Sequence, residues 1–164
     1  CDHGPGKLNI REFDSLTTFF VLGHPTLCTY GEDCAGFVVV EHTGDAFCCE
    51  FFVEPRWRLG NIHETPLSEL AGAERNRAFA RQKRDLAEAC TRCSFLKVCR
   101  GGCLKDRMRL GGGPSSTCYF CESYQQFFDY ALLTFIDMAR AIRDGRLDRH
   151  TRPAVSVRLR IPRT

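Results

Sequence analysis

Apolar side chains recur at helical spacing in two stretches of the chain, one near each end. The first pattern comprises Leu8, Ile10, Phe13, Leu16, Phe19 and Phe20. The second comprises Phe127, Phe128, Ala131, Leu132, Phe135, Ile136 and Ile142. The first pattern stops at Gly23-His24-Pro25 and the second near Gly145, and glycine and proline typically end helices. We therefore predict one amphipathic helix over residues 8–22 and another from residue 127 to near Gly145.

Between these two helices, two short β-rich runs flank a turn. Residues 37–42 form the first run, Thr43-Gly44-Asp45 has the composition of a turn, and residues 46–53 form the second run. Two such runs joined by a glycine-containing loop predict a β-hairpin. Its outgoing strand is expected to carry Cys49.

The middle of the chain has little regular pattern. Thr65 is expected to cap a helix that has Pro66 at its first position and runs through Phe79. Residues 90–103 contain too many cysteines and turn residues for a long regular element, and residues 111–114 (Gly-Gly-Gly-Pro) predict a flexible break. Because the apolar elements are short, we expect metal–ligand bonds to replace an ordinary core and the metal-free chain to be largely disordered. The predicted fold class is α+β, small, irregular and cysteine-rich.

Composition narrows the functional classes only slightly. The chain has 164 residues, enough for one domain or a small pair. It contains no apolar run near the roughly 18 residues that span a bilayer. Its start, Cys1-Asp2-His3-Gly4, is neither a signal peptide nor an initiator methionine. We therefore expect a cytoplasmic protein without a membrane segment, represented by an internal piece or a trimmed product.

The net charge of +3 conceals a basic segment at residues 140–164. This segment has eight arginines against Asp144 and Asp148, so it carries +6 and the rest of the chain −3. A basic segment is able to bind nucleic acid or an acidic protein surface. Pro153, Pro162 and the scarcity of aromatic residues favour a solvated extension instead, so nucleic acid is not expected as a partner.

Eleven cysteines give the clearest chemical signal in the sequence. Eight of them form an ordered pattern: Cys28, Cys34, Cys49 after Gly44, Cys90-x2-Cys93-x5-Cys99-x3-Cys103, and Cys121. The odd total and the adjacent Cys48 and Cys49 disfavour a disulfide framework and favour metal thiolates in a reducing compartment. Eight thiolates suffice for two four-iron clusters or for two zinc sites with four ligands each. The cysteines lack the closely paired knuckles of zinc fingers, which favours iron–sulfur clusters over zinc. A zinc-binding interaction module is the alternative.

The cysteine order resembles that of the SPASM domain, the C-terminal auxiliary-cluster domain of many radical S-adenosylmethionine enzymes. Flanking residues resemble the anaerobic sulfatase-maturating enzymes, which oxidise a cysteine or serine of a sulfatase to formylglycine. The segments that carry this resemblance are residues 39–45, 51–62, 99–105 and 119–124, followed by Phe127-Phe128. Altogether the resemblance covers residues 8–128 of the chain.

The resemblance implies two [4Fe–4S] clusters that use interleaved ligands. The first would be held by Cys28, Cys34, Cys49 and Cys103, and the second by Cys90, Cys93, Cys99 and Cys121. With four thiolates each, neither cluster leaves an iron open for substrate. The implied roles are electron transfer away from a substrate radical and support of a peptide-binding surface. Cys1, Cys48 and Cys118 fall outside the pattern and are expected to be free structural thiols.

The resemblance also implies a division of the chain. Residues 1–27 would be the helix and linker that leave a missing N-terminal radical SAM barrel, residues 28–130 the SPASM domain, and residues 131–164 the end of the last helix and the basic tail. The barrel would bind S-adenosylmethionine and a third [4Fe–4S] cluster through a CxxxCxxC triad. No cysteines here have that spacing, because Asp106 stands where the third is needed after Cys103.

We therefore expect this fragment alone to be inactive, although the anaerobic enzyme that contains it would be an oxidoreductase. Its expected partners are its own radical SAM domain, an electron donor or acceptor protein, and a sulfatase-like protein or peptide substrate. A SPASM maturase that acts on a different peptide or protein is the alternative within the same class.

Glu50 is the candidate catalytic residue. In the maturases an aspartate directly follows the cysteine that corresponds to Cys49, and it is the proposed base that deprotonates the substrate side chain. Glu50 keeps the carboxylate but moves it one methylene further out. A general base must first lie within hydrogen-bond distance of the proton that it removes, and its pKa matters second. The alternative is that Glu50 is an exposed strand carboxylate without a catalytic role.

Other polar residues carry weaker expectations. His42 and Asp45 are expected to shape the hairpin turn. Lys105 and Arg107 would either offset the charge of a cluster or lie on solvated surface. Trp57 is expected to belong to the core.

Overall fold

The structure is a computed structural model and describes residues 10–146. It is a small mixed domain, mostly helical, with one antiparallel three-stranded sheet. The helices are α1 (Arg11–Leu22), α2 (Leu67–Ala71), α3 (Glu74–Arg81), α4 (Glu88–Thr91), α5 (Leu96–Cys99), α6 (Leu104–Arg107) and α7 (Cys121–Arg143). The strands are β1 (Val39–Val40), β2 (Asp45–Phe47) and β3 (Arg58–Asn61). Short 3-10 turns lie at Cys28–Tyr30, Pro55–Trp57, Gln82–Arg84 and Arg109–Gly111.

The two long helices confirm the prediction from apolar spacing. α1 ends where Gly23 adopts a φ of 82°, and the Gly23 N–H donates to the carbonyl of Phe19, which closes the last turn. α7 begins at Cys121, earlier than the apolar pattern indicates, and has arginines in its last turn, where positive charge stabilises a helix. Leu8 and the basic segment beyond residue 146 lie outside the described residues.

The predicted hairpin is present with shorter strands than expected. β1 and β2 pair antiparallel, with Val40 opposite Ala46, and Gly44 lies in the turn between them. The outgoing strand ends at Phe47, so Cys49 follows the strand rather than lying on it. This difference corrects the sequence-based expectation and places Cys49 on an irregular segment.

A third strand, β3, completes the sheet and has no counterpart in the sequence-based prediction. It pairs antiparallel with β2, and Ala46 lies opposite Gly60. The next residue, Phe47, lies opposite Arg58, so Leu59 is the extra residue of a β-bulge. A bulge breaks the alternation of side chains, and this irregularity explains why the segment lacks a strand signature.

The single helix predicted after Thr65 is two short helices. α2 and α3 are separated at Gly72, whose N–H donates to the carbonyl of Ser68, and at Ala73. Glycine is a poor helix former, and it is the natural place for this break. Pro66 precedes the first helical residue instead of occupying it, and no side chain caps α2 by a hydrogen bond.

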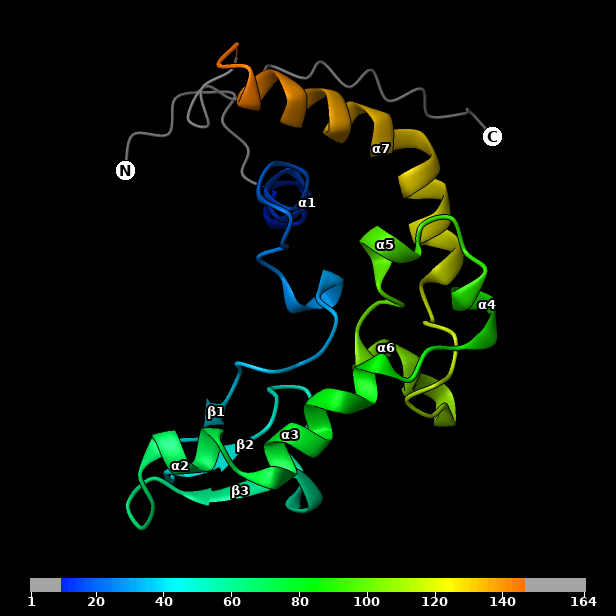
Figure 1. Cartoon of the computed structure of the whole chain (residues 1–164). Helices are drawn as coiled ribbons and strands as arrows, with labels where there is room; N and C mark the ends of the chain where they lie inside the picture. Colours follow the sequence, from blue (N-terminus) through cyan, green and yellow to red (C-terminus); the bar gives the residue numbers. More distant parts are fainter. Residues whose placement is uncertain (1–9, 147–164) are drawn as a thin grey trace, which may run out of the picture.

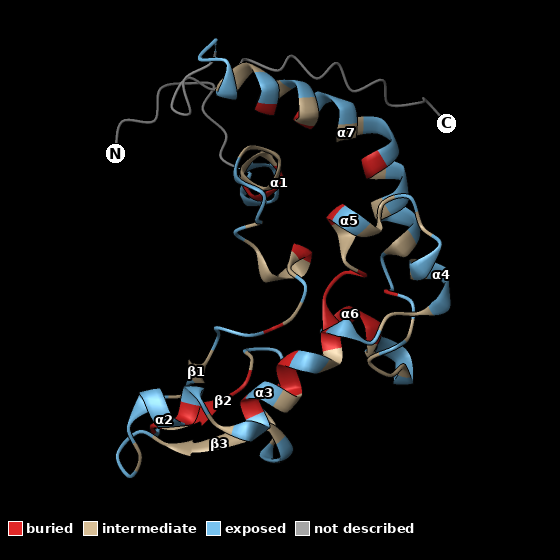
Figure 2. Ribbon diagram, in the orientation of Figure 1, coloured by how far each residue is buried: buried red, intermediate tan, exposed pale blue. Residues whose placement is uncertain are grey.

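Viewed as a whole, the described chain forms an arc (Figure 1). α1 and α7 lie at one end, the sheet and α2 lie at the other, and α4, α5 and α6 lie between them. Figure 2 shows that α6 and the loop before it are largely buried, whereas α4 is mostly exposed. No helix among residues 10–146 is long and apolar enough to cross a membrane.

Two apolar clusters occupy the two ends of the arc. The helix cluster, between α1 and α7, contains Leu16, Tyr30, Val98, Phe128 and Phe135. The sheet cluster contains Cys34, Cys48, Phe52, Phe79, Ala80 and Leu104, with Trp57 packed against it. The Phe79 ring lies edge-on at 5.2 Å from Phe52 and 5.0 Å from Trp57, so Trp57 belongs to the core as predicted. The expectation that metal–ligand bonds replace an ordinary core is therefore wrong at both ends.

Candidate metal centre

Four of the predicted ligands come together around Cys34 and form what we call the first thiol group. Cys28 begins a 3-10 turn after α1, and Cys34 lies in the loop that follows. Cys49 follows β2, and Cys103 immediately precedes α6. Burial raises the pKa of the Cys34 thiol to about 12, and the charges of the three other thiols add to this rise. The fold thus gathers these cysteines from three separate segments of the chain.

The hairpin turn explains the glycine within the cysteine pattern. Gly44 has a φ of 87°, and a Cβ atom there would lie 2.7 Å from a ring carbon of His63 and 2.8 Å from Oδ1 of Asn61. The Asp45 carboxylate accepts hydrogen bonds from Nη2 of Arg58 (2.6 Å) and Nδ2 of Asn61 (3.0 Å). These hydrogen bonds hold the pKa of Asp45 below its usual range. Asp45 therefore stabilises the turn as predicted, and the closely packed turn positions the end of β2.

A cavity between α4, α5 and the start of α7 is lined by the second thiol group. This group consists of Cys90, Cys93, Cys99, Cys118 and Cys121. Two CxxC turns of the same kind face the cavity: the Cys93 N–H donates to the Cys90 carbonyl (3.1 Å), and the Cys121 N–H donates to the Cys118 carbonyl (2.9 Å). Burial raises the pKa of the Cys99 thiol to about 11, and the neighbouring thiols add to this. The structure thus brings the four predicted ligands together with a fifth thiol.

The loop between α5 and α6 directs two nearby cysteines to different groups. Arg100, Gly101 and Gly102 have φ values of 51°, 73° and 70°, in the left-handed region that favours glycine. A Cβ on Gly101 would lie 2.6 Å from Nη2 of Arg107, and one on Gly102 would lie 2.8 Å from Sγ of Cys118. Because of this tight turn, the cysteine before the loop joins the second thiol group and the cysteine after it joins the first.

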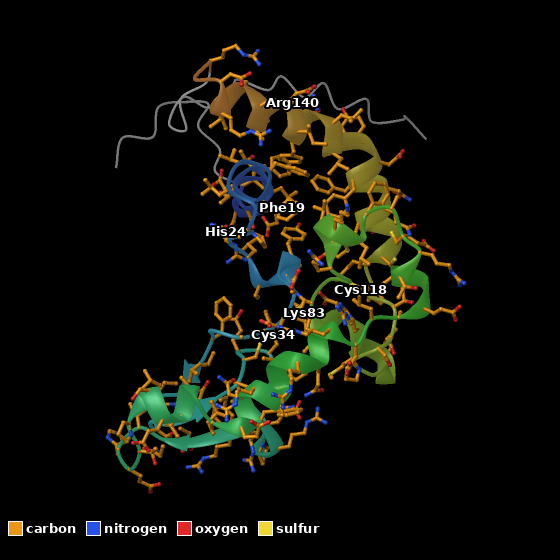
Figure 3. The ribbon with its side chains drawn as sticks, in the orientation of Figure 1. Phe19, His24, Cys34, Lys83, Cys118 and Arg140 are labelled. Carbon is orange, nitrogen blue, oxygen red and sulfur yellow. The ribbon has the colours of Figure 1, made fainter. Side chains whose placement is uncertain are left out.

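Two buried cations lie near the thiol groups. The exposed fraction is 1% for Lys83 and 2% for Arg107. Lys83 Nζ donates to the carbonyls of Cys28 and Thr29, and its charge acts on Cys34 nearby (Figure 3). Nothing in the local sequence marks Lys83 as buried, so sequence reasoning misses it. For Arg107, the solvated-surface alternative is wrong.

Glu50 lies at the surface beside the first thiol group. It is exposed and sits in the turn after β2, so it is not a strand residue. Burial raises the pKa of the Cys49 thiol, and the charge of Glu50 adds to this rise. Lys105 is also exposed, with Nζ 3.8 Å from the centroid of the Phe51 ring, and His42 is exposed in the hairpin turn. A carboxylate and an ammonium group thus flank the first thiol group at the surface.

The thiols outside the predicted ligand sets differ in their surroundings. Cys48 is completely buried in the sheet cluster, Cys118 lines the cavity of the second thiol group, and Cys1 lies outside the described residues. Every described cysteine is a free thiol. Within residues 10–146, no three His, Cys, Asp or Glu side chains are arranged to hold a single metal ion. Thiolates gathered in two groups are nevertheless the donor set that iron–sulfur clusters take, and binding requires loss of the thiol protons.

A family model described as an iron–sulfur cluster-binding domain, SPASM, matches residues 28–94. The cysteine-type anaerobic sulfatase-maturating enzyme of Clostridium perfringens (strain 13 / Type A) is 34% identical over 137 residues, which are 84% of this chain and 37% of that enzyme. This chain is a SPASM domain homologous to the C-terminal part of such enzymes. The resemblance inferred from the cysteine order is thereby confirmed.

The relatives of this SPASM domain include both cysteine-type and serine-type enzymes. The serine-type anaerobic sulfatase-maturating enzyme of Bacteroides thetaiotaomicron is 35% identical over 127 residues, 76% of this chain and 31% of that enzyme. The solved structure of native anSMEcpe with bound AdoMet and Cp18Cys peptide has a TM-score of 0.75 and 33% identity, covering 83% of this chain and 38% of that one. The same protein with the Kp18Cys peptide gives a TM-score of 0.76. The chain thus spans 37% of the Clostridium perfringens enzyme and 31% of the Bacteroides thetaiotaomicron enzyme.

Proposed function

We propose that this SPASM domain holds two [4Fe–4S] clusters, each on four thiolates. The first would be bound by Cys28, Cys34, Cys49 and Cys103, and the second by Cys90, Cys93, Cys99 and Cys121. The observation that carries the proposal is the gathering of these cysteines into two groups, although their order along the chain interleaves. We propose that Cys118 is a structural thiol, because it lies outside the family pattern.

Such clusters, when bound, exchange single electrons. With all four irons ligated, the proposed role is electron transfer away from a substrate radical, together with support of the substrate peptide. The residues of the chain contribute burial of the thiols and a mostly apolar surrounding, and both features limit solvent access and influence the reduction potential.

We further propose that the domain works within a radical SAM enzyme of the sulfatase-maturating kind. Residues 1–27 would connect it to the radical SAM barrel, residues 28–130 would form the cluster domain, and residues 131–164 would extend it. S-adenosylmethionine and a third cluster would belong to the barrel. The greater length of the relatives supports this division.

The proposed substrate is a sulfatase-like peptide whose cysteine or serine becomes formylglycine. Support comes from solved relatives that contain Cp18Cys and Kp18Cys peptides. Cysteine-type and serine-type enzymes are similarly related to the chain, so both residues are proposed as targets to be tested. The exposed carboxylate of Glu50, beside the first thiol group, is the proposed base.

Paired cysteine variants test the ligand assignment. Cys49→Ala and Cys121→Ala should each lose about four of roughly eight irons per chain, because each removes one ligand of a four-iron cluster. Cys48→Ala and Cys118→Ala are matched controls, since both cysteines are buried neighbours outside the ligand sets. Iron and sulfide would be measured on anaerobically reconstituted protein. Equal iron in Cys121→Ala and unmodified protein, or loss of iron in the controls, would contradict the assignment.

The substrate is tested in the enzyme that contains this domain together with its radical SAM barrel. Peptides with a sulfatase-derived sequence, carrying either cysteine or serine at the target position, would be incubated with it and examined for an aldehyde by mass spectrometry. Glu50→Gln should abolish the product, whereas Glu50→Asp should retain it, because only the latter keeps a base. Absence of aldehyde from both peptides would indicate a maturase of another substrate.

A further inference from the structure

The guanidinium group of Arg107 is buried and donates hydrogen bonds only to backbone carbonyls. Nε donates to Gly101 (2.9 Å), Nη2 to Arg100 (2.8 Å), and Nη1 to Lys83 (2.9 Å), Asp85 (2.9 Å) and Pro114 (3.0 Å). A planar group with five N–H donors is able to bind several carbonyls at once in one fixed geometry. Arg107 therefore contacts more separate backbone segments than an ordinary side chain does.

These carbonyls lie on the three segments that carry the second thiol group. Lys83 and Asp85 precede α4 and its CxxC turn, which contains Cys90. Arg100 and Gly101 follow the cysteine that ends α5. Pro114 precedes the second CxxC turn. A single side chain thus links all the segments that would have to meet around one cluster.

The charge of Arg107 has no carboxylate partner in the part of the chain that the structure describes. No ion pair joins the guanidinium to an acidic side chain of residues 10–146. Asp106 is also buried, but it forms none. The thiols whose charge acts on Arg107 are those of Cys90, Cys118, Cys34 and Cys99. A buried cation without a counter-charge is costly, so an anionic centre at these thiols would offset it.

From these contacts, and on the basis of the clusters proposed above, we propose that Arg107 is a positioning residue for the second cluster. Its hydrogen bonds hold the three ligand-bearing segments in register. Its positive charge offsets the negative charge of the thiolate-ligated cluster and raises the reduction potential of that cluster. Gly101 is needed for this arrangement because a Cβ there would collide with the guanidinium group.

Variants of Arg107 separate its charge from its hydrogen bonds. Arg107→Lys keeps a positive charge but loses the planar set of donors, and Arg107→Gln is neutral with an amide donor. Arg107→Ala removes both and leaves space for a small ion. Arg109→Ala is the control, because Arg109 is exposed and lies over the Tyr119 ring at 4.5 Å without contacting these carbonyls.

The experiment measures iron and sulfide per chain and the reduction potential of each cluster by EPR-monitored titration. Arg107→Ala should lose about half of the iron, which corresponds to one of the two four-iron clusters. Low concentrations of guanidinium should restore this iron and its potential. Urea, which has a similar shape but no charge, should not restore the potential. The Arg109→Ala protein should match the unmodified chain.

If Arg107→Ala does not fold, the Lys and Gln variants decide the matter. The second cluster should have a lower potential in Arg107→Gln than in Arg107→Lys, whereas the first cluster should change less. Equal potentials in these two variants, or Arg107→Ala with unchanged iron and potential, would overturn the inference. The unmodified chain is measured in parallel: absence of a second cluster from it would refute the proposed function itself, which is a separate outcome.

Discussion

The α1–α7 end of the molecule and its cysteine-bearing middle are held together in different ways. At the first, two long helices bury a shared face of Leu16, Phe128 and Phe135, and the Phe13 and Phe135 rings meet edge to face at 5.4 Å. In the middle, residues 88–107 contain three helices of four residues each, too short to be stable alone. Val98 of α5 joins the helix cluster and Leu104 of α6 joins the sheet cluster, and arginine–carbonyl hydrogen bonds and thiols hold the rest of this stretch.

This difference predicts that the chain does not depend uniformly on metal. Burial of apolar surface stabilises α1 and α7 whether or not a cluster is present. The middle contains the buried cation Arg107, and a buried charge is unfavourable in an apolar environment unless it is paired. We therefore expect that the middle is ordered only when metal is bound, whereas the α1–α7 end stays folded without it.

Metal removal should have the largest effect. Amide hydrogen exchange of the metal-free and the cluster-loaded chain would be compared by mass spectrometry. Without metal, residues 88–107 should exchange freely because their short helices lose the bonds that hold them. α1 and the apolar part of α7 should keep their protection. Uniform loss of protection across both regions would show instead that the metal organises the whole chain.

The next effect should come from truncating the helix cluster. Leu16→Ala should destabilise the chain by about 2–5 kcal/mol, because Leu16 is completely buried in α1 and its removal leaves a cavity. Leu133→Ala is the matched control, since Leu133 lies on α7 with 74% of its surface exposed and should change stability by less than about 0.5 kcal/mol. Urea unfolding of the metal-free chain, followed by circular dichroism, measures both. Similar costs for the two leucines would contradict the packing described.

The smallest effect should be the difference between two glycine substitutions, one in the hairpin turn and one outside it. Gly44→Ala places a Cβ 2.7 Å from His63, whereas Gly36→Ala has the same kind of backbone conformation, with a φ of 88°, and nothing within 4 Å. Each substitution costs about 1–2 kcal/mol for the left-handed conformation. The overlap should add about 1–3 kcal/mol in Gly44→Ala alone, and should weaken iron binding by the first thiol group. Urea midpoints of iron release, measured anaerobically, would test whether the two alanines differ.

Features with a local cause were predictable from the sequence. Apolar spacing predicted α1 and α7, and Gly23 marked the end of α1. The cysteine order predicted which family the chain resembles, and the family pattern assigned ligand sets that the fold then places in two groups. The turn at Gly44 and the role of Asp45 also follow from turn composition.

Features with a long-range cause were not predictable. β3 forms by pairing with β2, and a bulge at Leu59 interrupts the alternation of its side chains between the two faces of the sheet. The burial of Lys83 and Arg107 depends on carbonyls supplied by distant segments, which no local pattern reports. The break between α2 and α3 was missed because one glycine is often tolerated within a helix.

The most direct test of the account is the number of iron, sulfide and zinc atoms per chain after anaerobic purification, together with the absorption spectrum. We expect about eight irons, a matching amount of sulfide, a brown colour and no zinc, because eight thiolates would ligate two four-iron clusters. A colourless protein with about two zinc ions per chain would contradict it, and would place this SPASM domain among zinc-binding interaction modules.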